Sequence, residues 1–149
     1  MEPKVILLVD DKELDQLLAL RAFRKGRGSN QVVVASDGLA ALDYLFCEGT
    51  YSKRSPADLP TVVFLDLKLP RLDSLEVLDR IRANERTCSL LVVLFSASCE
   101  QRDVDSGDAK GCNSYVLKPL DPEEFIATVQ ELEHYWIDVN LTPPESSRH

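Results

Sequence analysis

Three aspartates, a serine and a lysine stand at the ends of short apolar runs. The run VILLV is followed by Asp10 and Asp11, and VVFL is followed by Asp66. The run LLVVLF is followed by Ser96, and YVL is followed by Lys118. Because ligands bind at the carboxyl ends of parallel strands, these five side chains are expected to meet at one edge of a sheet. Each alone has an ordinary explanation as a cap, turn or solvated residue, but their shared position predicts a site.

The chemistry of such a site follows from its charges. Two carboxylates about 4 Å apart repel by roughly 4 kcal/mol at an effective dielectric constant of 20. Three carboxylates therefore cannot all stay ionised in one pocket without a cation. The chain has only two histidines and no CxxC pair, so the ligands are hard oxygens, which suit Mg²⁺. Lys118 and Ser96 would donate to an oxyanion, and a carboxylate beside Mg²⁺ and a lysine can serve as nucleophile in phosphoryl transfer.

The elements that must position these residues alternate along the chain. Short apolar runs predict strands, listed in order at residues 4–9, 31–35, 61–66, 90–96 and 114–118. Helical spacing of apolar residues predicts helices between them and after the last, at about 11–25, 37–46, 75–81, 101–110 and 122–136. Strands that are apolar throughout are buried on both faces. The pattern predicts an α/β fold, a doubly wound five-stranded parallel sheet with helices on both sides.

Composition narrows the class of protein. The chain has 149 residues, a formal net charge of −8 and a pI near 4.7. This charge disfavours nucleic acid and anionic membranes as partners. The longest apolar runs are far too short to span a membrane, and nothing at the N-terminus is typical of a signal peptide. No glycine-rich phosphate loop is present, so direct binding of ATP is not expected. We expect one cytoplasmic domain with its cysteines reduced.

Four segments, LLVDD, VVFLDLKLPRLDSLEVLDRIR, VVLFSAS and GCNSYVLKP, together resemble the receiver domain of two-component response regulators. The match extends from Lys4 to about Val139. The resemblance implies a flavodoxin-like (CheY-like) sheet with strand order 2-1-3-4-5. We assign residues 1–140 to the receiver domain and 141–149 to a flexible C-terminal tail.

The resemblance also implies a metal site and a phosphoacceptor. Asp66 corresponds to the aspartate that accepts a phosphoryl group from a histidine kinase or a phosphotransfer protein. Asp11 and Asp66 correspond to direct Mg²⁺ ligands, and Asp10 to a ligand that acts mainly through water. The backbone carbonyl of Lys68 would complete the protein's share of the coordination.

Three further positions correspond to the residues that respond to phosphorylation. Ser96 resembles the switch hydroxyl that bonds the phosphoryl group, and Lys118 the phosphate-binding lysine. Tyr115 resembles the switch aromatic, which turns inward when Ser96 moves. The bond between Lys118 and Pro119 is typically cis in the family. The implied function is signalling by phosphorylation-dependent binding to a downstream protein, with self-phosphorylation and self-dephosphorylation as the only chemistry.

The tail HYWIDVNLTPPESS and the loop CEGTYSKRSPADLP resemble a narrower group, stand-alone regulators that partner phytochrome-type histidine kinases. About thirty residues follow Lys118, so we expect a stand-alone receiver without a helix-turn-helix output domain. Two alternatives stay open for the apolar residues of the tail, which are a homodimer contact or a cover for the chain's own core. These residues are Tyr135, Trp136, Ile137, Val139 and Leu141.

The sequence departs from the family at Ser74, where glycine usually follows Asp73. Ser74 is strained if the position needs a positive φ, and harmless if Asp73 caps the helix. Lys12 and Lys68 add two cations near the site, and Ser98 occupies a position that tunes hydrolysis in the family.

Two other functions compete with this one. The first is a receiver-like scaffold that binds its partner without phosphorylation. The second is a phosphohydrolase of the aspartyl-phosphate type, which would carry an acid where Lys68 stands.

Overall fold

A five-stranded parallel sheet forms the centre of the computed structural model, which describes residues 4–25, 30–98 and 100–140. The strands are β1 (Val5–Val9), β2 (Gln31–Ala35), β3 (Val62–Leu65), β4 (Leu91–Ser96) and β5 (Ser114–Leu117). Their spatial order is β2-β1-β3-β4-β5, and every neighbouring pair is parallel. The predicted fold class and strand order are confirmed.

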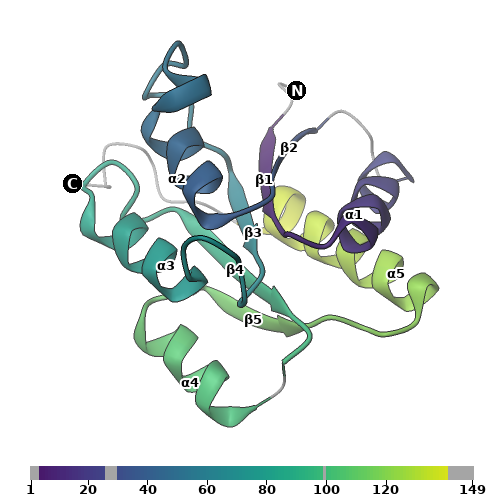
Figure 1. Cartoon of the computed structure of the whole chain (residues 1–149). Coiled ribbons are helices and arrows are strands. Elements are labelled where there is room, and N and C mark those ends of the chain that lie inside the picture. The colour runs from purple at the N-terminus through teal and green to yellow at the C-terminus, as the bar shows by residue number, and fades with distance from the viewer. Residues whose placement is uncertain (1–3, 26–29, 99, 141–149) are drawn as a thin grey trace.

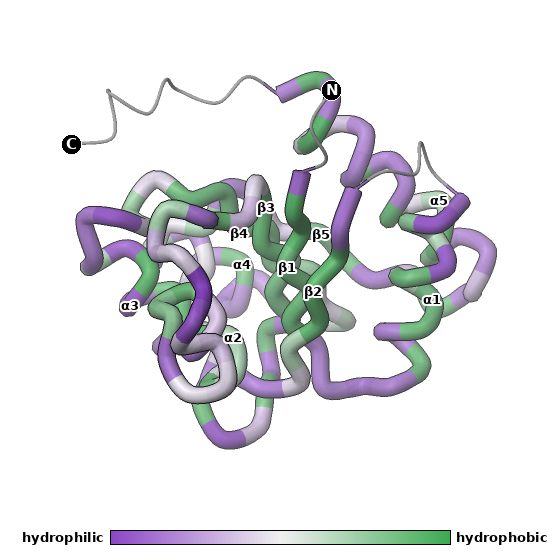
Figure 2. Tube along the Cα trace, turned by 90° about the horizontal axis from the view of Figure 1, so that it is seen from above, coloured by the Kyte–Doolittle hydropathy of each residue, from purple (hydrophilic) through white to green (hydrophobic). Residues whose placement is uncertain are grey.

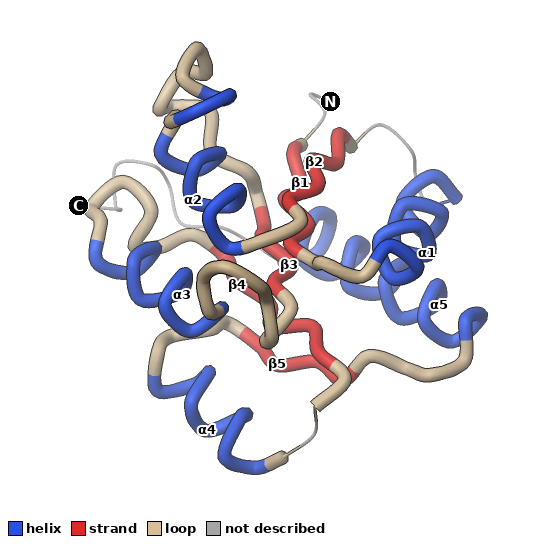
Figure 3. Tube along the Cα trace, viewed as in Figure 1, coloured by secondary structure: helices blue, strands red, loops and turns tan. Residues whose placement is uncertain are grey.

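Helices cover both faces of this sheet (Figure 1). They are α1 (Glu13–Lys25), α2 (Gly38–Phe46), α3 (Ser74–Ala83), α4 (Gln101–Ala109) and α5 (Pro122–Glu133), with a 3₁₀ turn at Gly49–Tyr51 and a π-helical turn at His134–Val139. One face carries α1 and α5, and the other carries α2, α3 and α4 (Figures 1 and 3). No helix in the described parts of the chain is both long and apolar enough to cross a membrane.

The core consists of two apolar layers, one on each side of the sheet. Along β1, Leu7 and Val9 pack towards α2 and α3, whereas Ile6 and Leu8 pack towards α1 and α5. The other central strands alternate in the same way, and the hydrophobic strands lie inside the molecule in Figure 2. Because both faces are covered, the central strands β1 and β3 are apolar at every position, which is why the sequence shows continuous runs.

Local signals at the helix starts fix the connections around the site. The Asp37 carboxylate accepts a hydrogen bond from the Ala40 amide, and α2 begins at Gly38. A Cβ at Gly38 would lie 2.4 Å from the carbonyl oxygen of Leu72, so only glycine lets α2 approach the β3–α3 connection this closely. At α5, the Asp121 carboxylate accepts from the Glu124 amide.

Part of the tail covers the chain's own core, and the homodimer contact stays a prediction. Ile137 is buried, and Trp136 packs against the apolar layer under α1 and α5. The Lys4 ammonium donates to the carbonyl of Ile137 at 2.8 Å, which ties the tail to the start of β1. Tyr135 and Val139 are about half exposed. Leu141 lies outside the described residues.

Candidate functional site

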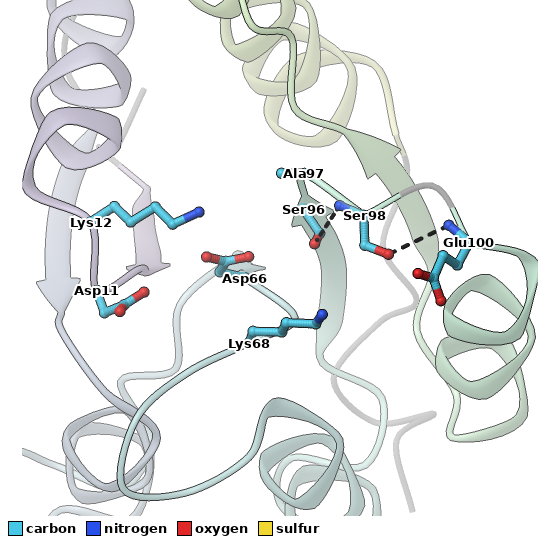
Figure 4. Close-up of a pocket in the computed structure, with 8 residues that line it drawn as sticks. All are labelled: Asp11, Lys12, Asp66, Lys68, Ser96, Ala97, Ser98 and Glu100. Carbon is cyan, nitrogen blue, oxygen red and sulfur yellow. Dashed lines mark hydrogen bonds between the residues drawn. The ribbon is translucent and has the colours of Figure 1, made fainter.

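The predicted residues meet at the carboxyl edge of the sheet. Asp10 and Asp66 directly follow β1 and β3, Ser96 ends β4, and Lys118 follows β5. These four residues are buried, with 3–5% of their surfaces exposed, while Asp11 is exposed. An open pocket of about 650 Å³ lies beside Asp11, Asp66 and Ser96. Its lining, shown in Figure 4, is Asp11, Lys12, Asp66, Lys68, Ser96, Ala97, Ser98 and Glu100.

The three predicted carboxylates lie close enough to share one ion. One oxygen from each of Asp10, Asp11 and Asp66 lies within 4.8 Å of the others. Three carboxylates beside an open pocket match the oxygen-only ligand set of a hard divalent cation that keeps water ligands. Two cations also line the pocket, and in Figure 4 the side chains of Lys12 and Lys68 lie on different sides of Asp66. The Lys68 side chain is exposed, and the role of its carbonyl stays a prediction.

Lys118 connects the buried carboxylates. Its ammonium donates to Oδ2 of Asp10 at 2.7 Å, of Asp15 at 2.9 Å and of Asp66 at 3.2 Å. A lysine has three donors, so all are used. Burial alone would lower the pKa of Lys118, but the bonds to Asp10 and Asp15 and the charge of Asp66 outweigh it and raise the pKa. The ammonium therefore stays charged within the buried site.

Asp66 is held in an environment that disfavours its ionised form. Burial raises the pKa of the Asp66 carboxyl, the Lys118 ammonium opposes that shift, and the charge of Asp10 adds to it. Asp10 has both oxygens engaged, because Oδ1 accepts from the Lys12 amide at 3.0 Å and Oδ2 accepts from Lys118. A divalent cation would offset the remaining negative charge of this cluster.

The β4–α4 connection links Ser96 to two other elements. The Ser98 amide donates to Oγ of Ser96 at 3.2 Å, and the Ser98 hydroxyl donates to the Asp103 carboxylate on α4. The hydroxyl of Tyr115 on β5 donates to the Ser98 carbonyl at 2.9 Å. A displacement of Ser96 would therefore reach α4 through the Ser98 hydroxyl and β5 through the Ser98 carbonyl.

The structure answers the question raised by Ser74. Among the described non-glycine residues only Cys47 and Arg71 have a positive φ, so Ser74 is unstrained and the left-handed residue of this connection is Arg71. Asp73 occupies the cap position without a capping hydrogen bond from its side chain. Ser74 is instead fully buried, and its hydroxyl donates to the backbone carbonyl of Asp66. Glycine at this position would lack that bond.

Two residues of this network are not predicted from the sequence, namely Asp15 and Asp103. Asp15 stands one helical turn after Asp11, and this spacing is the signal that would place it at the same edge. One expectation is wrong in the structure. No peptide bond in the described residues is cis, so the bond between Lys118 and Pro119 is trans.

The fold and the acidic edge define a class of protein. The model of the response regulator receiver domain matches residues 6–130, and the chain belongs to this family. Its function is signal transduction by phosphorelay. Receiver domains are phosphorylated by histidine kinases and bind a divalent metal ion at an acidic pocket, which here is the cluster of Asp10, Asp11 and Asp66.

Particular relatives cover nearly the whole chain. The probable methanogenesis regulatory protein FilR2 of Methanothrix harundinacea is 36% identical over 142 residues, which are 95% of this chain and 89% of that protein. The crystal structure of the Mn²⁺-bound form of response regulator Rcp1 has a TM-score of 0.87 and 30% identity, covering 95% of this chain and 100% of that one. The phosphorylated cyanobacterial phytochrome response regulator RcpA has a TM-score of 0.89 and 29% identity, covering 96% and 100%.

Proposed function

We propose that this chain is a single-domain response regulator that accepts a phosphoryl group on Asp66. The observation that carries the proposal is the position of its carboxylate, which is buried, 3.2 Å from the Lys118 ammonium and grouped with two further carboxylates. A nucleophile of this kind needs a cation and a donor for the incoming phosphoryl oxygens. At this edge the three carboxylates would hold the cation, and Lys118 and Ser96 would be the donors. Rcp1 and RcpA, which match over their full lengths, support the single-domain assignment with a receiver at residues 1–140.

Each side chain has a defined task in the proposed reaction. An Asp66 oxygen forms a bond to phosphorus while the phosphorus–nitrogen bond of a phosphohistidine breaks, and that electron pair stays on the imidazole. Lys118 and the Ser96 hydroxyl donate to the phosphoryl oxygens. Hydrolysis reverses the state, because water attacks phosphorus and Asp66 leaves as a carboxylate. Ser98 lines the same pocket.

We propose Mg²⁺ as the cation. Asp10, Asp11, Asp66 and the carbonyl of Lys68 would hold it, and the bound ion would neutralise charge on the phosphoryl oxygens. An oxygen-only ligand set with an open side suits Mg²⁺ and Mn²⁺ alike, and the Mn²⁺-bound form of Rcp1 supports a small divalent ion here.

The partners are proposed from the surface beside the site and from the relatives. Leu14 and Leu17 on α1 and Leu120 after β5 are exposed, and the Asp15–Lys118 bond brings α1 and that connection together. Such apolar residues around a phosphoacceptor suit a kinase docking surface. The phytochrome response regulator RcpA supports a phytochrome-type histidine kinase as donor. Phosphorylation would then change binding to a downstream protein, and the exposed Tyr135 and Val139 offer a homodimer contact.

An acyl phosphate donor tests the proposal directly. Wild type incubated with acetyl phosphate and Mg²⁺ should gain the mass of one phosphoryl group, located on Asp66 by peptide mass spectrometry. Asp66→Asn should gain nothing, while Asp108→Asn, at an exposed position of α4, should behave as wild type. If wild type takes up no phosphate, the scaffold function replaces this one. Turnover of free phosphomonoesters would instead identify a phosphohydrolase.

A further inference from the structure

Lys118 links the predicted metal ligands to Asp15, a carboxylate outside their group. Its Oδ2 lies 2.9 Å from the Lys118 ammonium, and 19% of the Asp15 side chain is exposed against 4% for Lys118. The other two partners of this ammonium, Asp10 and Asp66, belong to the group that can hold a cation, whereas Asp15 does not. Lys118 is therefore shared between that group and one residue of α1.

A bound cation would compete with Lys118. The Oδ2 atoms of Asp10 and Asp66 accept from the ammonium, and a divalent ion would attract the same carboxylates and repel the ammonium. Without another acceptor, Lys118 would keep both carboxylates from the ion or lose its partners inside the protein. An unpaired buried ammonium is costly, so either outcome would weaken metal binding.

The first turn of α1 is fixed well enough to provide that acceptor. The side-chain amide of Gln16 donates to the carbonyl of Asp10 at 2.5 Å and to Oγ of Ser36 at 3.2 Å. These bonds tie the start of α1 to the ends of β1 and β2. Asp15 therefore has a set position relative to Asp10, independent of the ion.

We propose that Asp15 is a positioning residue. This role rests on the proposed function. The Asp15 carboxylate retains the Lys118 ammonium beside Asp66 while Asp10 and Asp66 turn to the divalent cation. Outer partners of metal ligands typically change metal affinity by about 10–100-fold when they are removed. Asp15→Asn is accordingly expected to weaken Mg²⁺ binding about tenfold.

Calorimetric titration of the full chain with Mg²⁺ provides the first measurement. Glu13→Gln is the matched control, because Glu13 is an exposed acid in the same turn and the variant removes the same charge. Its dissociation constant should stay within about twofold of wild type, since exposed charges act weakly. Asp15→Glu keeps the carboxylate and should recover part of the affinity that Asp15→Asn loses.

Lysine labelling provides a measurement that does not depend on phosphorylation. With saturating Mg²⁺, an amine-reactive acetylating reagent should modify Lys118 slowly in wild type and several times faster in Asp15→Asn, as read by peptide mass spectrometry.

Equal Mg²⁺ affinity of Asp15→Asn and Glu13→Gln would overturn the inference. So would a Lys118 that becomes fully reactive in wild type when Mg²⁺ binds, a test that holds even if Asp15→Asn does not fold. A wild type that binds no Mg²⁺ overturns this inference together with the proposed metal site, whereas normal wild-type binding with no effect of Asp15→Asn overturns the inference alone.

Discussion

The phenolic hydroxyl of Tyr115 on β5 donates a hydrogen bond to the backbone carbonyl of Ser98, at 2.9 Å. Ser98 in turn donates its amide to Ser96, so Tyr115 supports the connection that leads from the site to α4. Tyr115 is partly buried, and its inward turn after phosphorylation stays a prediction. In the structure the ring also packs against the apolar layer under α2 and α3.

Tyr115→Phe tests how firmly this bond holds the connection. One hydrogen bond contributes about 1 kcal/mol, so exchange of the Ser98 amide is expected to become about fivefold faster. Hydrogen exchange followed by NMR measures this rate. Tyr135→Phe, at an exposed position of the tail, is the control and should leave the rate unchanged. An equal rate in wild type and Tyr115→Phe would mean that the bond does not restrain the connection.

Ser74→Ala tests the hydroxyl that contacts the backbone of Asp66. The hydroxyl is buried, and alanine leaves the Asp66 carbonyl without this donor, so the free energy of unfolding should fall by about 1–2 kcal/mol. Urea denaturation measures the change, with Ser52→Ala, at an exposed loop position, as control. Because Ser74 has no positive φ, Ser74→Gly should relieve no strain. A Ser74→Gly protein more stable than wild type would contradict this account.

The sequence predicts the fold and the central site residues for one physical reason. Asp10, Asp66 and Lys118 each follow an apolar run directly, and the end of a buried strand fixes where the next side chain lies. Side chains on helices are harder to place, because their direction depends on how the helix packs. Asp15 and Asp103 therefore become visible only once α1 and α4 are placed against the sheet.

Ser74 shows a further limit of sequence reasoning. The sequence allows strain or a harmless place beside a helix cap, and the structure shows a third outcome, a hydrogen bond to the Asp66 backbone. That bond depends on the path of the whole β3–α3 connection, including the left-handed residue Arg71. Local propensity does not determine such a path.

Lys118→Met tests the balance of charge at the site. Without metal, the variant leaves the buried carboxylates of Asp10 and Asp66 uncompensated, and the free energy of unfolding should fall by about 3–5 kcal/mol. Mg²⁺ should restore more stability to the variant than to wild type, because no ammonium competes for the carboxylates. Thermal unfolding with Mg²⁺ and with a chelator measures both effects. Lys110→Met removes an exposed ion pair with Asp79 and should change little. A Lys118→Met protein as stable as wild type in chelator would show that Lys118 does not balance the cluster.

Glu133, at the end of α5, provides a pH-dependent test away from the metal site. It is 5% exposed and accepts a hydrogen bond from the Asn30 side chain at 3.1 Å. Burial raises the pKa of Glu133 above its ordinary value of 4.5, the bond from Asn30 opposes this shift, and the charge of Asp138 adds to it. The folded state therefore binds the proton more tightly than the unfolded state. The stability that this proton contributes is complete below pH 4.5 and is lost as the pH rises through the raised pKa.

Glu133→Gln keeps the oxygen that accepts from Asn30 and removes the buried charge. The variant is expected to be more stable than wild type at pH 7, and this advantage should disappear towards pH 4.5. Urea denaturation at several pH values measures the difference between the two proteins, in which the titration of all other groups cancels. Glu131→Gln, at an exposed position of α5, should show no such pH-dependent difference. A difference between wild type and Glu133→Gln that stayed constant from pH 4.5 to 7 would mean that Glu133 titrates alike in the folded and unfolded states.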